Sequence, residues 1–215
     1  GNGNTVSGVI EAAWDVSQGK TVSGDTSRLG NIKFSGDWGS ATIGSQYSVL
    51  TDTEWNTCKI SGSGCGGLHG YQGRIADALV IRGPAIGPLA LAMQAEADGS
   101  DLAAWAISTG LDLGTISVTV AYRDDDSDTT TQVAATTSIA GVTLAASYAS
   151  LGSGDDGNSI YAKISGIKLA YTEQGGITAM GANYDVDLGG ATMRLILDDD
   201  EGGDTTIGVQ WMYSL

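Results

Sequence analysis

Proline, phenylalanine, histidine and cysteine are all scarce in this chain of 215 residues. It holds 2 Pro, 1 Phe, 1 His and 2 Cys, whereas Gly occurs 33 times. The glycines follow no G-X-Y period, which excludes a collagen-like chain. No apolar run reaches 18 residues, so no transmembrane helix is expected. Thr, Val, Ile, Ala and Ser dominate while Lys and Glu are few, a composition that favours strands over helices.

Positive charge is the other deficit. The chain has 10 Lys and Arg against 25 Asp and Glu, a formal net charge of −15 at pH 7. Sequence-independent nucleic-acid binding needs a cationic face, so no nucleic-acid partner is expected. An enzyme is not expected either, because the single histidine and the lack of a G-x-S-x-G element leave no recognisable nucleophile–base pair. No cofactor is expected.

Both cysteines and the histidine lie in one stretch, residues 56–74, "NTCKISGSGCGGLHGYQGR". Cys58 and Cys65 form a close, even pair, which suits a disulfide in an oxidising compartment. Two unpaired thiols are the alternative. A metal site is less favoured, because His69 is alone and no third or fourth ligand is evident.

Alternation of apolar and polar residues is the strongest signal in the sequence. In residues 115–123, "TISVTVAYR", every second residue is apolar, which predicts a strand with one apolar and one polar face. Fourteen such segments can be recognised, at 5–16, 28–36, 40–50, 73–82, 88–97, 102–112, 115–123, 129–139, 142–151, 158–165, 167–173, 177–187, 191–197 and 205–215. Most match the roughly 9–11 residues of a tilted membrane-spanning strand and exceed the roughly 5–6 usual in soluble sheets.

The connections alternate between tight turns, such as Ala140–Gly141 and Ser165–Gly166, and longer, more acidic loops. Short turns on one side and long loops on the other are typical of an up-and-down outer-membrane barrel. Ionisable residues on the polar parity suit a water-filled interior, and those expected on the lumen wall are Glu11, Asp15, Glu96, Lys163, Lys168, Asp185 and Arg194. A soluble β-sandwich binding module, whose outer face also tolerates charge, is the alternative. A barrel serving as a surface scaffold or adhesin is a third hypothesis.

Residues 28–48, "RLGNIKFSGDWGSATIGSQYS", resemble the strand–turn–strand signature of the Gram-negative general porin family. That signature runs close to F-V-G-L-K-G-D-F-G-T-V-T-L-G-R-Q-Y, and here 36–39, 42–44 and 46–47 stand for G-D-F-G, T-L-G and Q-Y. Residues 5–12, "TVSGVIEA", resemble the family's opening strand. Residues 72–93 resemble the segment that follows its constriction loop. The resemblance is specific over 1–97.

The chain also departs from the family pattern. The family normally has 16 strands, and this chain lacks the second and third of them, which leaves about 14, with 16 as the alternative. Ser45 replaces the family's arginine in G-R-Q, and Leu215 replaces the usual C-terminal phenylalanine.

The resemblance implies an all-β, antiparallel, up-and-down transmembrane β-barrel in the outer membrane of a Gram-negative bacterium. It implies a single domain over 1–215, with 51–72 as a long constriction loop that folds inward and that a Cys58–Cys65 disulfide would brace. The implied activity is passive diffusion of small hydrophilic solutes and ions, through a homotrimer in contact with outer-membrane lipid and lipopolysaccharide. The expected constriction residues are Asp52, Glu54, Lys59 and His69 on the loop and Arg28, Lys33, Arg74 and Arg82 on the wall.

Most of the acidic residues fall in the longer loops, as in "RDDDSD" and "LDDDEGGD". A negative mouth concentrates cations and repels anions over a Debye length of about 8–10 Å, which predicts a mild cation preference. Neither run has the order of an EF-hand loop, so no metal site is expected. Weak divalent-ion binding stays open at two groups, Asp124, Asp125 and Asp126, and Asp198, Asp199 and Asp200.

Overall fold

The computed structural model describes residues 3–11, 14–15, 20–21, 29–53, 73–152, 154–200 and 205–213. These residues form strands and one short 3-10 helix. In chain order the elements are β1 Thr5–Glu11, β2 Trp14–Asp15, β3 Lys20–Thr21, β4 Leu29–Gly36, β5 Gly39–Tyr47, the 3-10 helix η1 Val49–Thr53, β6 Arg74–Arg82, β7 Leu89–Asp98, β8 Asp101–Asp112, β9 Ile116–Asp124, β10 Thr129–Ile139, β11 Val142–Leu151, β12 Gly157–Ile164, β13 Ile167–Gln174, β14 Ile177–Asp187, β15 Ala191–Asp200 and β16 Thr206–Tyr213.

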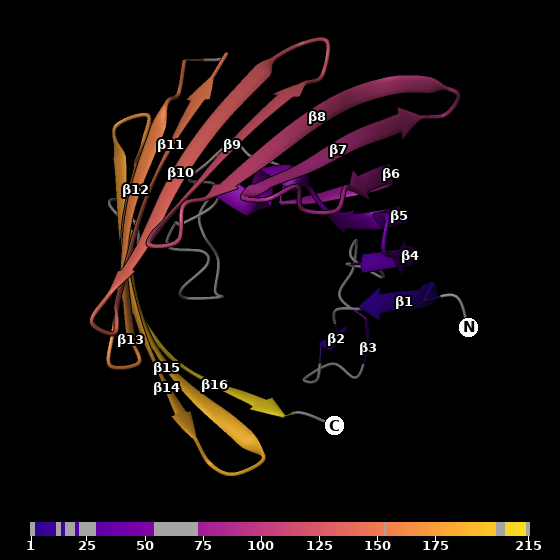
Figure 1. Ribbon diagram of the computed structural model, residues 1–215. Coiled ribbons are helices and arrows are strands. Elements are labelled where there is room, and N and C mark those ends of the chain that lie inside the picture. Colours follow the sequence, from indigo (N-terminus) through magenta and orange to yellow (C-terminus); the bar gives the residue numbers. More distant parts are fainter. Residues whose placement is uncertain are drawn as a thin grey trace. The chain divides into compact units, whose positions relative to one another are not determined.

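Fourteen of these strands pair in one sheet in the order β1-β4-β5-β6-β7-β8-β9-β10-β11-β12-β13-β14-β15-β16. Apart from β1 beside β4, each strand lies beside its neighbour in sequence, as Figure 1 shows, and the ladders are antiparallel. Over the described residues this confirms the predicted count of 14 strands and not the alternative of 16. β2 and β3 pair separately, Trp14 with Thr21 and Asp15 with Lys20.

The chain divides into two compact units by its internal contacts. The first unit comprises Gly1–Asp52, Tyr71–Leu111 and Ala121–Thr129. The second unit comprises Thr53–Gly70, Asp112–Val120 and Thr130–Leu215. Each is described by itself below.

In the first unit, the sheet has an apolar face with large exposed side chains and a polar face with small or polar buried ones. On β7, Leu91 and Met93 are 42% and 60% exposed, whereas Ala92 and Gln94 between them are each 4% exposed. The apolar face of β6 and β8 carries Leu79, Ile81, Trp105 and Ile107, and the polar face carries Ala78, Val80, Ala104, Ala106 and Ser108. A soluble sheet buries its large apolar residues, so this inverted pattern is that of a sheet whose apolar face meets lipid.

The second unit repeats this inversion over β11–β15. Its apolar face exposes Leu144, Ile160, Leu169, Met180, Leu195 and Leu197. Its polar face buries Ala145, Tyr161, Ala170, Thr172, Asn183 and Ile196. The polar face of this unit also holds a small hydrophobic cluster, formed by Ala145, Tyr161 and Ala170.

Two of the tight turns show why the strand register is so regular. Ala140 and Gly141 have φ of 52° and 82°, and Ser165 and Gly166 have φ of 50° and 86°. Positive φ at both central residues is the geometry of a type I′ hairpin, whose twist matches that of the flanking strands. The sequence predicts both turns at these positions.

Two predicted strands end earlier than the alternation suggested. The strand predicted at 5–16 leaves the main sheet after Glu11, and the strand predicted at 40–50 ends at Tyr47. The 3-10 helix η1 then begins at Val49. No helix among the described residues is long and apolar enough to cross a membrane.

Candidate functional site

The 3-10 helix η1 begins because Ser48 caps it. The Ser48 hydroxyl accepts a hydrogen bond from the Leu50 N–H at 3.2 Å, and the Ser48 carbonyl accepts from the Thr51 N–H at 3.1 Å. A serine that bonds the backbone two residues on favours a turn over a continued strand. This turn directs the chain away from the sheet ladder immediately before residues 54–72.

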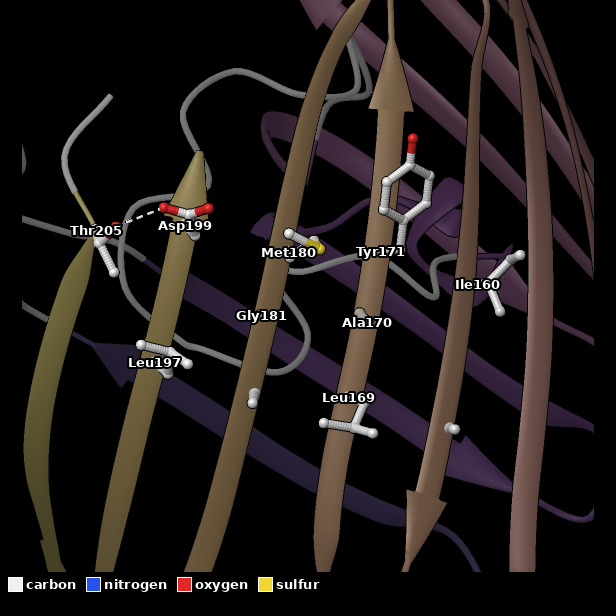
Figure 2. Close-up of a pocket in the computed structure, with 11 residues that line it drawn as sticks. Ile160, Leu169, Ala170, Tyr171, Met180, Gly181, Leu197, Asp199 and Thr205 are labelled. Atoms are coloured by element: carbon white, nitrogen blue, oxygen red, sulfur yellow. Dashed lines mark hydrogen bonds between the residues drawn. The ribbon is translucent and has the colours of Figure 1, made fainter. Parts of the chain in front are cut away.

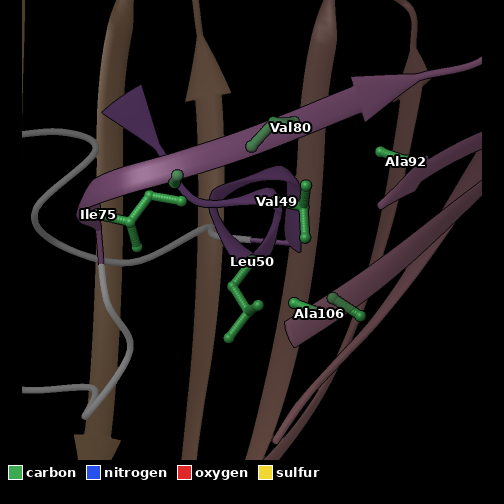
Figure 3. Close-up of a cluster of buried hydrophobic side chains, with 8 residues drawn as sticks. Val49, Leu50, Ile75, Val80, Ala92 and Ala106 are labelled. Atoms are coloured by element: carbon green, nitrogen blue, oxygen red, sulfur yellow. The ribbon is translucent and has the colours of Figure 1, made fainter. Parts of the chain in front are cut away.

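The turn packs on the polar face of the first unit. Val49 and Leu50 are both 0% exposed and belong to a buried cluster with Ile75, Ala78, Val80, Ala92, Ala106 and Ala121. Figure 3 shows Val49 and Leu50 on the turn, near Ile75 and Val80 of β6 and Ala106 of β8, which belong to the same cluster. Because the strands present alanine here, the face has room for two larger side chains from the turn. The start of the predicted constriction loop therefore lies against the polar face.

Asp52 is held on this face by an ion pair. The Arg82 guanidinium donates from Nη1 to Asp52 Oδ2 at 2.6 Å and from Nη2 to Oδ1 at 3.2 Å, and the Ser108 hydroxyl donates to Oδ2 at 3.3 Å. Arg82 on β6 and Ser108 on β8 are both register partners of Ala92 on β7. The Asp52 carboxylate therefore bonds to residues on either side of that alanine. The side chains of Arg82 and Asp52 stay 41% and 32% exposed, so both can meet a solute.

A glutamine orients the start of the turn. Within the first unit, the Val49 N–H donates to Gln94 Oε1 at 2.8 Å, a buried contact. Within the second unit, which begins at Thr53, the Thr53 hydroxyl donates to Gln132 Oε1. A buried backbone N–H needs such an acceptor, because leaving it unpaired costs roughly 1–3 kcal/mol.

A second charged group lies nearby in the first unit, around Arg123 on β9. Its Nε donates to Glu96 Oε1 at 3.1 Å and its Nη1 to Asp125 Oδ2 at 2.5 Å. Arg123 is 7% exposed, so the two carboxylates offset the cost of burying its charge. The hydrogen bond from Arg123, with another from the Ser127 hydroxyl, lowers the pKa of Asp125 from its usual 3.8 to about 2.

The second unit holds a charged triad on its polar face. Asp185 accepts from Arg194 Nε at 2.6 Å, from Arg194 Nη2 at 3.0 Å and from Lys168 Nζ at 3.0 Å. Asp185 and Arg194 are register partners on β14 and β15. Lys163 pairs directly with Lys168 across β12 and β13 and is exposed.

The predicted wall residues of the first unit are placed differently from one another. Lys33 pairs with Thr42 and Thr42 with Val80, so Lys33 shares the polar face with Arg82, exposed and without a described contact to Asp52. Glu11, on β1, is half-buried.

Arg74 lies on the opposite face. It alternates with the buried Ile75 and pairs with Tyr47, which is 50% exposed. A register shift between Gly44 and Gln46 separates this end of β6 from the end that carries Arg82. Among the described contacts, Arg82 is thus the predicted wall cation that the structure brings to Asp52.

Several predicted residues lie outside the part of the chain that the structure describes. They are Glu54, Lys59, His69, Arg28, Cys58 and Cys65, together with the side chains of Asp15 and Asp200. Their roles, and the Cys58–Cys65 disulfide, stay predictions.

The acidic turn at 124–128 is organised by hydrogen bonds. Asp125 Oδ1 accepts from the N–H groups of Ser127 and Asp128 at 3.3 and 2.8 Å, and Asp124 Oδ1 accepts from the Asp126 N–H at 3.2 Å. Among the described residues, no group of three or more His, Cys, Asp or Glu could hold a metal ion. Weak divalent binding here stays a prediction.

Sequence reasoning missed the residues that hold the turn: Gln94, Ser108, Arg123 and Gln132. A signal was present, since two of them are amides in mid-strand on the polar parity: Gln94 follows Ala90 and Ala92 on β7, and Gln132 lies between Thr130 and Ala134 on β10. Their partners could not be named from the sequence, because residues 40–50 were predicted as one continuous strand and the turn at Val49 was not expected.

The apolar face of the second unit has a groove, shown in Figure 2. Small residues at Gly181 and Ala182 leave a hollow between the larger Leu169, Met180 and Leu197. Its polar groups are the Tyr171 hydroxyl and, at one end, Asp199 and Thr205, whose hydroxyl donates to Asp199 Oδ1 at 2.6 Å. Such a lining suits hydrocarbon and not a hydrophilic solute, so the polar face is the candidate site.

Comparisons with known proteins give one family. The family model for the Gram-negative porin matches residues 1–215. A comparison with curated protein sequences finds no match.

Solved porins share the fold at low sequence identity. An anion-selective porin from Comamonas acidovorans superposes with a TM-score of 0.67 at 13% identity, over 100% of this chain and 82% of that one. A mutant of Rh. blastica porin gives 0.74 at 12%, over 98% and 84%. Salmonella typhi OmpF in complex with daunomycin gives 0.67 at 15%, over 92% and 78%. At these identities the likeness establishes the fold, which is that of porin barrels.

Proposed function

This chain belongs to the Gram-negative porin family, and we propose that it is a passive diffusion channel for small hydrophilic solutes and ions with a mild cation preference. Membership places it in the outer membrane of a Gram-negative bacterium, as a β-barrel protein that is not an enzyme. A soluble β-sandwich, the alternative drawn from the sequence, is thereby wrong. The exposed apolar face is what such a barrel turns to lipid.

The observation that carries the proposal is the position of Asp52. The turn before residues 54–72 packs against the polar face, and it sets a carboxylate against Arg82 with both groups part-exposed. Opposed charges at a narrow point filter solutes by size and by charge. We therefore assign Asp52 and Arg82 to the constriction. The roles of Lys33 and of the four predicted constriction residues outside the described part remain proposals, whereas Arg74 lies on the opposite face and is not assigned to the constriction.

The cation preference follows from how the charges are compensated. Arg82, Arg123, Lys168 and Arg194 each already contact a carboxylate. The carboxylates in the longer loops far outnumber the cations that remain in the chain. Their field extends over about a Debye length, 8–10 Å, and raises the local cation concentration.

The assembly and the bracing of the channel are further parts of the proposal. We infer a single domain over 1–215, a homotrimer, and contacts with lipopolysaccharide, and these rest on the family resemblance. A Cys58–Cys65 disulfide would brace the chain after η1. Its presence can be checked by the mass of the 56–74 peptide before and after reduction.

Planar-bilayer recording tests the channel directly. The refolded protein in a KCl gradient is expected to give discrete conductance steps with a reversal potential of cation-selective sign. An anion-selective sign would contradict the cation preference while leaving the channel intact. The absence of steps from protein that shows a heat-modifiable gel shift would favour the alternative function, a surface scaffold or adhesin with little conductance.

A further inference from the structure

A series of buried and part-buried polar contacts leads from the turn at Val49 to the acidic loop at the end of β9. The Val49 N–H donates to Gln94 Oε1 at 2.8 Å, and Gln94 Nε2 donates to Glu96 Oε1 at 2.8 Å. The same Glu96 oxygen accepts from Arg123 Nε at 3.1 Å, and Arg123 Nη1 reaches Asp125 at 2.5 Å. The side chains of Arg123 and Glu96 are only 9% and 11% exposed.

The strand between the charged partners makes this contact possible. Glu96 is on β7 and Arg123 on β9, with β8 between them in the sheet. Neighbouring strands are about 4.8 Å apart, so the two side chains must span about 10 Å. Ala104 on β8 is the register partner of Glu96 and is buried, and its single methyl group leaves the path open. A larger residue at 104 would block it.

We propose that Gln94, Glu96 and Arg123 are positioning residues that set where Asp52 stands in the channel, and so tune its charge selectivity. This inference rests on the proposed function of Asp52. None of the three contacts Asp52 among the described bonds. They act through Val49, which lies in the same 3-10 turn as Asp52, three residues before it.

The physical reason is that the bond to Gln94 orients the start of the turn, whereas Arg82 and Ser108 hold only the Asp52 carboxylate. Val49 and Leu50 contribute undirected hydrophobic contacts, which hold the turn to the face without fixing its rotation. The bond from Val49 to Gln94 is directional, and the amide of Gln94 is itself oriented by Glu96. Arg123 and Asp125 in turn fix the Glu96 carboxylate from the side of the acidic loop.

Two substitutions interrupt this series of hydrogen bonds at different points. Gln94→Met keeps the size of the side chain, removes both hydrogen bonds of the side-chain amide and leaves the Glu96–Arg123 ion pair in place. Arg123→Gln removes the cation, and Arg194→Gln in the second unit is its matched control. That control loses the same charge from an ion pair on the polar face of the second unit, where its described partner is Asp185.

The experiment measures reversal potential in a KCl gradient for these variants, alone and combined with Asp52→Asn. Gln94→Met and Arg123→Gln are each expected to change the cation-to-anion permeability ratio in the wild-type background. In the Asp52→Asn background, Gln94→Met is expected to leave the ratio unchanged, since residues that act through one group are not additive. Arg123→Gln is expected to keep there only the effect of its lost charge, which Arg194→Gln measures. Arg194→Gln is expected to act equally in both backgrounds.

The outcomes separate the two claims. If Gln94→Met and Arg123→Gln shift the ratio by equal factors with and without the Asp52 carboxylate, or not at all, the positioning role is overturned and the proposed function stands. If Asp52→Asn alone leaves selectivity unchanged, Asp52 is not in the constriction, and the inference falls with it. The heat-modifiable gel shift of each variant confirms that the barrel has formed, and Gln94→Met serves if Arg123→Gln does not fold.

Discussion

Asp52 and Arg82 form a bidentate ion pair between the 3-10 turn and strand β6, with Nη1–Oδ2 at 2.6 Å and Nη2–Oδ1 at 3.2 Å. Both oxygen atoms of the carboxylate accept a hydrogen bond, which fixes the plane of the carboxylate as well as its position. Both side chains remain partly exposed.

Removing the cation of this pair should strengthen cation selectivity. Arg82→Gln leaves Asp52 uncompensated, so the cation-to-anion permeability ratio from reversal potentials in KCl is expected to rise. Lys33→Gln removes an equal charge from the same face, where Lys33 has no described contact with Asp52. If the two variants shift the ratio equally, the effect comes from net charge and not from the pair.

Truncating the buried leucine of the turn should loosen it. Leu50→Ala removes a side chain that is 0% exposed, and such changes cost about 2–5 kcal/mol in a packed core. Urea unfolding in detergent micelles measures the loss. Leu91→Ala, on the apolar face and 42% exposed, is the control and should cost less. Equal losses would mean that the turn is not packed on the polar face.

A charge on the apolar face should hinder membrane insertion. Met93 is 60% exposed on that face, and Met93→Lys is expected to cost about 2–4 kcal/mol if it lies near the bilayer midplane. Ala90→Lys places the same charge on the exposed end of the polar face of β7, and little loss is expected. The measurement is the urea dependence of folding into lipid vesicles. A larger loss for Ala90→Lys would reverse the assignment of the two faces.

Acid should weaken the turn that follows β9. Arg123 holds the pKa of Asp125 at about 2, below the usual 3.8. Because the folded-state pKa is the lower one, this stabilisation is present above about pH 4 and is lost as the pH falls from about 4 to 2. The free energy of unfolding as a function of pH should show this step in the wild type.

The matched variants for this step lie in the same turn. Asp125→Asn is expected to flatten the dependence between about pH 4 and 2, whereas Asp126→Asn, outside the ion pair with Arg123, should keep it. An unchanged slope in Asp125→Asn would assign the acid sensitivity to other carboxylates.

The placement of the arginines shows where prediction from the sequence stopped. Arg74 and Arg82 have the same parity, so alternation alone predicts that both lie on the same face of β6. A bulge between them would place them on opposite faces, so the register of residues 75–82 is ambiguous from the sequence. The register shift between Gly44 and Gln46, with Asp77 at a φ of 47°, puts the two on opposite faces. A bulge adds one residue to one strand, and nothing in the alternation marks where that occurs.

The turn at Val49–Thr53 was hidden for a related reason. Val49 continues the alternation of Ile43 and Tyr47 on β5, so the sequence favours a longer strand. Ser48 and the alanines at 92 and 106 decide otherwise, since a cap and a small-residue surface on distant strands together favour the turn.

By itself, the sequence determined the fold class, the 14 strands and the two tight hairpins at Ala140–Gly141 and Ser165–Gly166. These depend on the two-residue period and on local turn chemistry, which a sequence displays directly. Only the tertiary structure decided that Asp52 meets Arg82, and that Glu96 and Arg123 join across Ala104. Such contacts depend on register, bulges and the room left by small side chains on strands far apart in the chain, and these are set when the sheet assembles.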